Sequence, residues 1–109
     1  RLRLHFHDTR GTGLANAYAG VEAGVDVLDA SVGGIGGCPF APGAAGNLAT
    51  EDLVLLAERS GFATGLSLDG LLNAVDFAQA QLQRPLGGRS IAWLQRQRDK
   101  RRDAESIAA

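Results

Sequence analysis

Two strand-like segments separated by one helical segment constrain the fold of this 109-residue chain more than any other feature. Residues 2–7 alternate between apolar and polar side chains, which is the period-two pattern of a strand. Residues 25–32, VDVLDASV, are short and rich in β-branched side chains, which also favours a strand. Between them, apolar residues recur at helical spacing over 12–23. Strands joined through a helical crossover pair in parallel, so the sequence predicts an α/β fold.

A parallel sheet of only two strands is incomplete as an independent fold. Parallel strands are normally covered on both faces, and an isolated pair leaves its edges open. The chain also begins directly with the strand-like RLRLHFHD and has no initiator methionine. We therefore expect these residues to be a piece of a longer α/β protein, with little stability and no activity when isolated.

Three helical segments are predicted after the second strand. Thr50 is a suitable N-cap for the first of them, acidic residues occupy its first turn, and Gly61 ends it. The second runs from about Leu68 to Gln83 and has an apolar face that includes Leu82. A last, basic helix is expected to start near Ser90.

Charge is distributed unevenly along the chain. Residues 1–83 carry four arginines against nine acidic residues, whereas residues 84–109 carry seven lysines and arginines against three acidic residues. Acids are interspersed in the basic segment and no aromatic residue follows Trp93, so we interpret it as a solvated helix face and expect no nucleic-acid partner. No apolar run approaches the ~20 residues of a membrane span. The single cysteine cannot form an internal disulfide, which fits a reducing compartment.

His5 and His7 are the only histidines, and both lie at the end of the first predicted strand, before a glycine-containing loop. Residues i and i+2 of a strand point to the same side, so both imidazoles can face one metal ion. Two half-buried histidines satisfied by hydrogen bonds explain the HxH pattern alone equally well. The position favours a ligand site, because such sites gather at the C-terminal ends of strands in α/β sheets and barrels.

Cys38 is the only cysteine and lies in the glycine- and proline-rich segment VGGIGGCPFAPGAAGN, residues 32–47. This composition offers little to bury a structural thiol, and it indicates a loop able to close over a site. The thiol could act there as a nucleophile, a proton donor or a third metal ligand, and with His5 and His7 it would suit zinc. Asn47 ends the segment, either as a turn residue or as an oxygen ligand of the kind that Mg²⁺ or Mn²⁺ accepts.

Residues 2 to about 83 resemble the C-terminal part of the 3-hydroxy-3-methylglutaryl-CoA lyase family, whose members are metal-dependent enzymes built on a TIM (β/α)8 barrel. The segment HFHDTRGTGLANA is similar to lyases and related condensing enzymes alike, whereas GGCPFAPGAAGN resembles the lyase loop specifically. The resemblance implies a C-terminal fragment of the barrel. Residues 2–7, 25–32 and about 45–47 would be strands six, seven and eight, and appended helices would follow them.

By position, the resemblance implies that His5, His7 and Asn47 are metal ligands and that Cys38 is the catalytic cysteine of the loop. It also implies a role for His5 in proton transfer, and it places Asp8 where it would orient the histidines. In this family a further carboxylate ligand and a substrate arginine come from the first barrel strand, upstream of the present sequence. Together with that carboxylate, the nitrogen and oxygen donors favour Mg²⁺ or Mn²⁺ as the cofactor.

The resemblance further divides the chain into a part of the catalytic barrel, residues 1–62, an appended helix, residues 63–88, and a basic helical tail, residues 89–109. The implied activity of the full-length protein is carbon–carbon lysis, namely retro-Claisen cleavage of 3-hydroxy-3-methylglutaryl-CoA to acetyl-CoA and acetoacetate. The implied partners are an acyl-CoA substrate and a second subunit in a dimer. We expect a cytoplasmic location in a bacterium and a mitochondrial matrix location in a eukaryote, with no membrane association.

Three alternatives stay open from the sequence. One is a related acyl-CoA lyase acting on citramalyl-CoA or on a longer branched hydroxyglutaryl-CoA. Another is a short metal-binding or interaction module without catalysis. The third is a structural zinc site formed by His5, His7 and Cys38.

Overall fold

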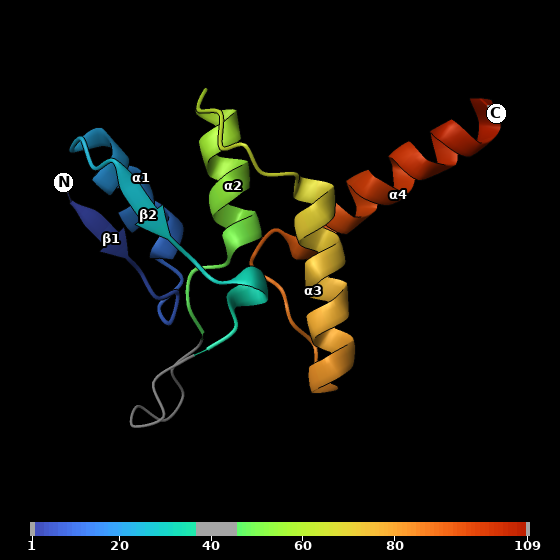
Figure 1. Cartoon of the computed structure of the whole chain (residues 1–109), viewed down its shortest axis with the longest axis horizontal. Helices are drawn as coiled ribbons and strands as arrows, with labels where there is room; N and C mark the ends of the chain where they lie inside the picture. The colour runs from blue at the N-terminus through green and yellow to red at the C-terminus, as the bar shows by residue number, and fades with distance from the viewer. Residues whose placement is uncertain (1, 37–45, 109) are drawn as a thin grey trace.

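The computed structural model describes residues 2–36 and 46–108. It is an α/β structure, as the sequence predicts, with two short strands and helices that follow one another away from the strands (Figure 1). In chain order the elements are β1 (Arg3–His5), α1 (Gly13–Glu22), β2 (Val27–Asp29), the short 3₁₀ helix η1 (Val32–Gly34), α2 (Thr50–Arg59), α3 (Leu68–Leu82) and α4 (Ile91–Ala108).

β1 and β2 form a parallel two-stranded sheet, which confirms the predicted pairing. Both strands are shorter than the predicted segments 2–7 and 25–32, because the chain beyond each of them pairs with a third segment instead. The register sets the residues of β1 opposite those of β2 in the order Arg3 with Val27, Leu4 with Leu28 and His5 with Asp29.

The third segment surrounds Leu48 and lies across the ends of both strands. Its backbone N–H donates to the carbonyl oxygen of Phe6 at 3.0 Å, and its carbonyl oxygen accepts from the N–H of Ser31 at 3.0 Å. A single bridge also joins His7 to Asn47. The predicted third strand is therefore a short run of bridges. It places Asn47 next to His7, two residues after the end of β1.

α1 covers one face of the small sheet (Figure 1). Leu4 packs against Gly20 of this helix, where a Cβ atom would lie 2.8 Å from the leucine side chain. Ala17, one turn earlier on the helix, is fully buried. These small residues let α1 lie close to the sheet. Because side chains alternate along a strand, His5 and Asp29 lie on the opposite face.

α2 begins one residue earlier than the predicted cap implies. Thr50 is its first residue and Ala49 is the N-cap, so the assignment of Thr50 as N-cap is wrong. The reason is that the backbone N–H of Thr50 already donates to the carbonyl oxygen of Ser31 at 2.9 Å, and this tie to the end of β2 starts the helix. Gly61 follows the helix in the left-handed region, with φ of 93°, as expected for a residue that ends it.

α3 lies beside α2, on the side away from α1 (Figure 1). Ser67 caps it, because its hydroxyl accepts a hydrogen bond from the N–H of Gly70 at 3.0 Å. The helix ends within one residue of the prediction, and Gln83 follows it with φ of 53°. Leu82 is 47% exposed, contrary to the predicted apolar face, because the last turn of α3 extends beyond the elements that cover the rest of the helix (Figure 1).

α4 extends away from the body of the molecule, and most of its side chains are exposed, as predicted for a solvated basic helix (Figure 1). Arg98 is the buried charged residue of this helix, since it is only 7% exposed and its Nη1 lies 3.1 Å from a carboxylate oxygen of Asp76 on α3. This ion pair, together with the buried Leu94, joins the first half of α4 to α3.

The buried apolar side chains form a core that runs from α1 through the Leu48 segment to α2, α3 and the start of α4. Its members are Ala17, Leu48, Ala49, Val54, Leu72, Val75 and Leu94. The strand ends that carry the candidate site residues lie at the border of this core. Within the described part of the chain, none of the helices has the length and apolar character needed to cross a membrane.

Candidate functional site

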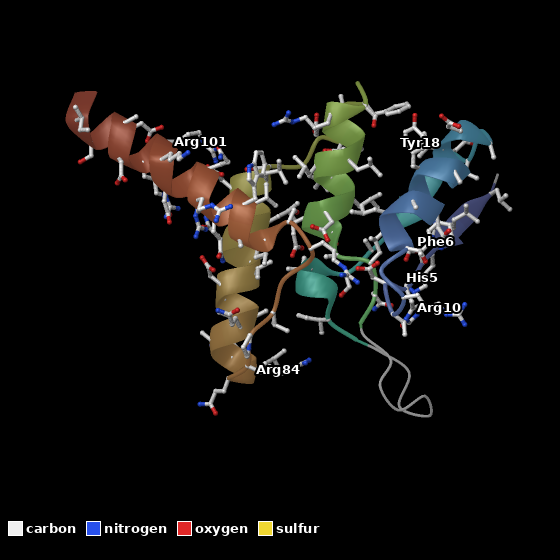
Figure 2. All side chains as sticks on the ribbon, turned by 180° about the vertical axis from the view of Figure 1, so that it is seen from behind. His5, Phe6, Arg10, Tyr18, Arg84 and Arg101 are labelled. Atoms are coloured by element: carbon white, nitrogen blue, oxygen red, sulfur yellow. The ribbon has the colours of Figure 1, made fainter. Side chains whose placement is uncertain are left out.

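His5 and His7 lie side by side at the end of β1, as the strand spacing predicts. Their ring centroids are 5.1 Å apart and the rings meet edge to face, at 79°. Both residues are exposed, so the hypothesis of two half-buried structural histidines is not supported. Figure 2 shows His5 near the point where β1 leads into the turn before α1. The two imidazoles can therefore meet a ligand from the same side.

Asp29 is a site residue that the sequence analysis missed. It lies directly opposite His5 in the parallel register, and its Oδ1 is 2.5 Å from Nδ1 of His5. The signal was present in the sequence, since both strands end in a polar residue and a parallel register can bring those residues together. What was lacking was the register itself, because a shift by one residue moves a side chain to the other face.

Asp8 does not orient the histidines, so that prediction is wrong for the described structure. Its Oδ1 accepts the backbone N–H of Gly13 at 2.9 Å, and its Oδ2 accepts Nε–H of Arg89 at 2.9 Å. The hydrogen bond to Asp8 raises the pKa of Arg89 above its ordinary value. The reason is directional, because the chain turns after His7 and points the Asp8 carboxylate toward the start of α1.

Asn47 is held next to His7 by the backbone bridge between them, as a shared ligand site requires. Its side-chain Nδ2 donates to the carbonyl oxygen of Ile35 at 2.9 Å. This contact fixes the amide, and its oxygen accepts no hydrogen bond from the residues that the structure describes. Within residues 2–36 and 46–108, no three His, Cys, Asp or Glu side chains are grouped to hold a metal ion, so this part offers two imidazoles and one amide oxygen.

Cys38 lies outside the described residues, and so does most of the glycine-rich loop that contains it. The two ends of that segment are described, and they leave the fold close together. A Cβ on Gly36 would lie 2.8 Å from Nδ2 of Asn47, and a Cβ on Gly46 would lie 2.6 Å from the carbonyl oxygen of Gly36. The segment therefore leaves and rejoins the described structure beside Asn47.

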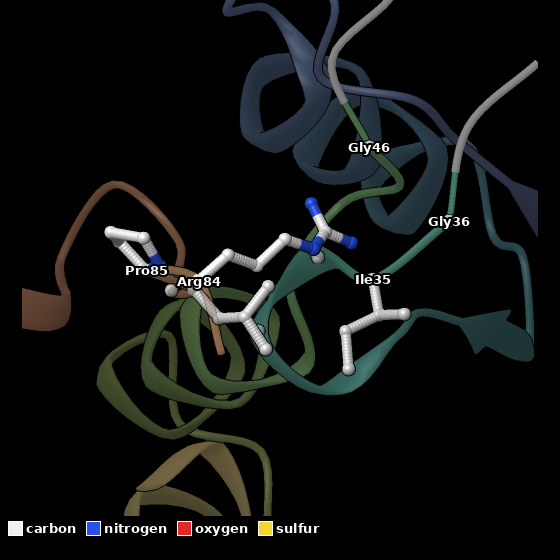
Figure 3. Close-up of a pocket in the computed structure, with 9 residues that line it drawn as sticks. Ile35, Gly36, Gly46, Arg84 and Pro85 are labelled. Atoms are coloured by element: carbon white, nitrogen blue, oxygen red, sulfur yellow. The ribbon is translucent and has the colours of Figure 1, made fainter. Parts of the chain in front are cut away.

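A cavity of about 490 Å³ lies beside these two ends, and Arg84 from the segment after α3 reaches across it (Figure 3). A second cavity, of about 280 Å³, lies next to it and is bordered by Asn47, Asp8 and Arg89. From the sequence, the residues after α3 were predicted to be part of an appendage. In the structure they form one side of both cavities.

Two buried carboxylates hold that segment in place, and the sequence analysis expected them only to favour the helix dipole. Glu51 accepts the N–H of Gly33 and the N–H of Gly88, each at 2.9 Å. Asp52 accepts the N–H of Arg89 at 2.7 Å, the N–H of Ser90 at 2.9 Å and the Ser90 hydroxyl. Glu51 is 0% exposed and Asp52 is 2% exposed. These bonds join the start of α2 to η1 and to residues 88–90.

Comparisons with known proteins show which family this chain is similar to. Residues 1–78 match the family model described as HMGL-like. The chain is 45% identical over 91 residues to the hydroxymethylglutaryl-CoA lyase YngG of Bacillus subtilis, an alignment that covers 84% of this chain and 30% of that protein. It is 54% identical over 85 residues to the (R)-citramalyl-CoA lyase of Chloroflexus aurantiacus, covering 78% of this chain and 27% of that protein.

A solved structure agrees with these sequence relatives. An HMG-CoA lyase from Acinetobacter baumannii, in complex with coenzyme A and 3-methylmalate, superposes with a TM-score of 0.75 at 47% identity, and the match covers 82% of this chain and 29% of that chain. The resemblance found in the sequence is thus confirmed. The chain spans about 30% or less of the length of each of these proteins.

Proposed function

This chain belongs to the HMGL-like family, and we propose that the intact protein cleaves 3-hydroxy-3-methylglutaryl-CoA to acetyl-CoA and acetoacetate. The observation that carries the proposal is the meeting of His5, His7 and Asn47 at one strand end. Support comes also from the Bacillus relative, which is named for this activity. We further propose that the chain corresponds to about strands six to eight of the barrel, with residues 63–88 and 89–109 as helical additions.

We propose that His5, His7 and Asn47 would hold a divalent cation, Mg²⁺ or Mn²⁺. The donors fit, because the two imidazoles lie on one side of the strand end and the Asn47 amide, fixed through its Nδ2, supplies an oxygen next to them. A bound cation would supply Lewis acidity that lowers the pKa of a substrate hydroxyl. The carboxylate ligand that the family adds would come from a part of the protein outside this chain.

We assign the proton transfers of the reaction to the side chains of His5 and Cys38. Loss of the proton from the 3-hydroxyl lets the carbon–carbon bond break, which releases acetoacetate and leaves an enolate of acetyl-CoA that takes up a proton. Nδ1 of His5 is engaged by Asp29, so Nε2 is the atom that His5 can offer to the cation or to the substrate proton. Cys38 is proposed as the proton donor to the enolate, since an ordinary thiol, with pKa about 8.5, is mostly protonated at neutral pH.

The test is acetoacetate release from 3-hydroxy-3-methylglutaryl-CoA by the full protein that carries this chain, with Mg²⁺ and after chelation. We expect Asn47→Ala to lower the Mg²⁺-supported rate by about 100-fold, because a lost ligand weakens the charge stabilisation that the cation supplies. Asn16→Ala is the matched control, since Asn16 is exposed on α1 and its amide makes a long, 3.5 Å contact with Thr12 of the same segment.

Two outcomes would contradict the proposal at different levels. A wild-type protein that releases no acetoacetate would refute the activity. A full rate from Asn47→Ala at ordinary Mg²⁺ concentrations would remove Asn47 from the site but leave the activity standing. Cys38→Ser tests the proton donor separately, and wild-type turnover in that variant would refute its role.

A second candidate is cleavage of citramalyl-CoA to acetyl-CoA and pyruvate. The identity to the Chloroflexus (R)-citramalyl-CoA lyase, 54%, is higher than that to the Bacillus lyase, 45%, although over a shorter alignment. The ratio of kcat/KM for the two substrates decides between them. A structural zinc site is the third alternative, and zinc that is retained through purification but lost on Cys38→Ala would favour it.

The expected dimer and the expected compartment stay predictions. Size-exclusion chromatography with light scattering of the full protein tests the first.

A further inference from the structure

We infer that Asp29 is a positioning residue for His5, which holds Nδ1 and presents Nε2 to the divalent cation. The inference rests on the proposed function, because it assigns a residue to the cation site of that reaction. It adds a residue from β2 to a site whose other described members come from the end of β1 and from Asn47.

The sheet itself sets this contact. Asp29 and His5 are cross-strand neighbours at the last paired position of β1 and β2, and both lie on the face opposite Leu4, which packs against α1. The Oδ1 to Nδ1 distance is 2.5 Å. The backbone positions are determined by the ladder and by the packing of α1, so the approach of the two side chains does not depend on a flexible loop.

The chemistry of the pair determines which nitrogen is free. An ionised carboxylate only accepts hydrogen bonds, so Nδ1 of His5 must carry the proton. In a neutral imidazole the other nitrogen, Nε2, then has the lone pair that binds a cation. A carboxylate in this position also restricts rotation of the ring.

The position of His7 also indicates the side from which a cation would approach His5. Its ring lies edge to face with that of His5 at 5.1 Å, so a cation that contacts both rings has to approach from the side where they meet. Asp29 holds the ring of His5 from β2. Among the described acidic residues, Asp29 is the one that forms an ion pair with a histidine. Asp8, which follows His7 directly, is committed to Gly13 and Arg89.

The experiment uses the full protein, with Mn²⁺ as the probe. We expect Asp29→Ala to weaken Mn²⁺ binding, measured by titration calorimetry, by about 10- to 100-fold. Asp29→Asn keeps a neutral acceptor of the same shape and should fall between wild type and Asp29→Ala. Asp26→Ala is the matched control, because Asp26 is an exposed acid three residues earlier in the same segment and forms no ion pair with any described residue.

A second readout does not depend on the cation. Nitrogen-15 chemical shifts of the imidazole, assigned by comparison with His5→Gln, report which ring nitrogen carries the proton. We expect the Nδ1–H form in metal-free wild type and a shift toward the Nε2–H form in Asp29→Ala, with Asp26→Ala unchanged. A role of Asp29 in folding alone would not move the tautomer, and circular dichroism melting confirms that the variants fold.

Failure of the inference differs from failure of the proposed function. Wild-type Mn²⁺ binding that survives Asp29→Ala within twofold, with an unchanged His5 tautomer, would overturn the role of Asp29 and leave the activity intact. A wild-type protein that binds no Mn²⁺ and releases no acetoacetate would overturn the proposed function, and the presentation of Nε2 to a cation would fall with it.

Discussion

The carboxylate at the strand end and the carboxylates at the start of α2 are used in opposite ways. The side chain of Asp29 is 48% exposed and, among the residues that the structure describes, its partner is the imidazole of His5. Glu51 and Asp52 are buried, and their partners are backbone N–H groups and one serine hydroxyl from η1 and residues 88–90. The first contact orients the exposed imidazole of His5, and the second set joins the start of α2 to η1 and to residues 88–90.

Burial explains the difference. A buried carboxylate needs several hydrogen bonds to offset its desolvation, and its donors are in turn left unsatisfied if it is removed. An exposed carboxylate can exchange its partner for water at little cost, so its contact adds little stability. Exposure therefore separates the residues that we expect to affect stability from those that we expect to affect binding.

The largest expected effect would come from Asp52→Ala. Removal of this carboxylate leaves the N–H groups of Arg89 and Ser90 without their acceptor in a part-buried position, so we expect the free energy of unfolding to fall by about 3 kcal/mol. Urea denaturation of the full protein measures it. Asp69→Ala is the control, because Asp69 is also an acid in the first turn of a helix but is part of an exposed ion pair, and it should cost less than about 1 kcal/mol. Equal losses of unfolding free energy in the two variants would show that burial does not determine how much an acid in the first turn of a helix contributes to stability.

The next effect would come from Gly88→Ala, which tests how closely residues 88–90 approach α2. A Cβ at this position would overlap the carboxylate of Asp52 and would lie 2.6 Å from the side chain of Ala49. We expect a loss of about 2 kcal/mol from this overpacking. Gly70→Ala is the control, since its Cβ would lie 3.4 Å from Ser67 within α3, where alanine is neutral or stabilising. A Gly88→Ala protein as stable as wild type would contradict the close approach.

The smallest effect on stability is expected from Arg89→Leu. This variant tests a carboxylate, Asp8, whose partner is exposed. The ion pair of Arg89 with Asp8 joins residues 88–90 to the segment that follows β1, but the Arg89 side chain is 60% exposed. We expect a decrease in the urea midpoint that is smaller than that of Gly88→Ala and that disappears in 1 M salt, where exposed charges are screened. Arg96→Leu, on the exposed side of α4, serves as the control. A loss of unfolding free energy as large as that of Asp52→Ala would show that this ion pair contributes as much to stability as the buried carboxylates do.

Local patterns in the sequence were sufficient for the order of the strands and α-helices and for the helix ends to within one residue, but not for the ends of the strands. The alternation at the start of the chain, the helical spacing after Gly13 and the glycine at 61 each depend on a few neighbouring residues, and the structure has a strand, a helix and a helix end at these places. The cap at Thr50 was misplaced because a backbone bond to Ser31, rather than a side chain, starts α2. Leu82 was misjudged because apolar spacing says nothing about where the covering elements end.

The two histidines of the candidate site could also be predicted from the sequence. Two histidines two residues apart on a strand must share a face, and the structure places them together. The contacts of the carboxylates could not be predicted in the same way. Asp8 was expected beside the histidines because it is their neighbour in the chain, yet it pairs with Arg89, 81 residues away. Asp29 was overlooked because it is 24 residues from the histidine that it contacts.

A parallel α/β unit with two imidazoles at a strand end follows from the sequence alone, because backbone geometry makes side-chain direction periodic over short distances. Which carboxylate meets which donor depends on the packing of distant segments. Those pairings follow from the strand register and from the packing of residues 88–90 against α2, where the partners are 37 or 38 residues apart. A change of register by one residue would send Asp29 to the other face with no change in local pattern.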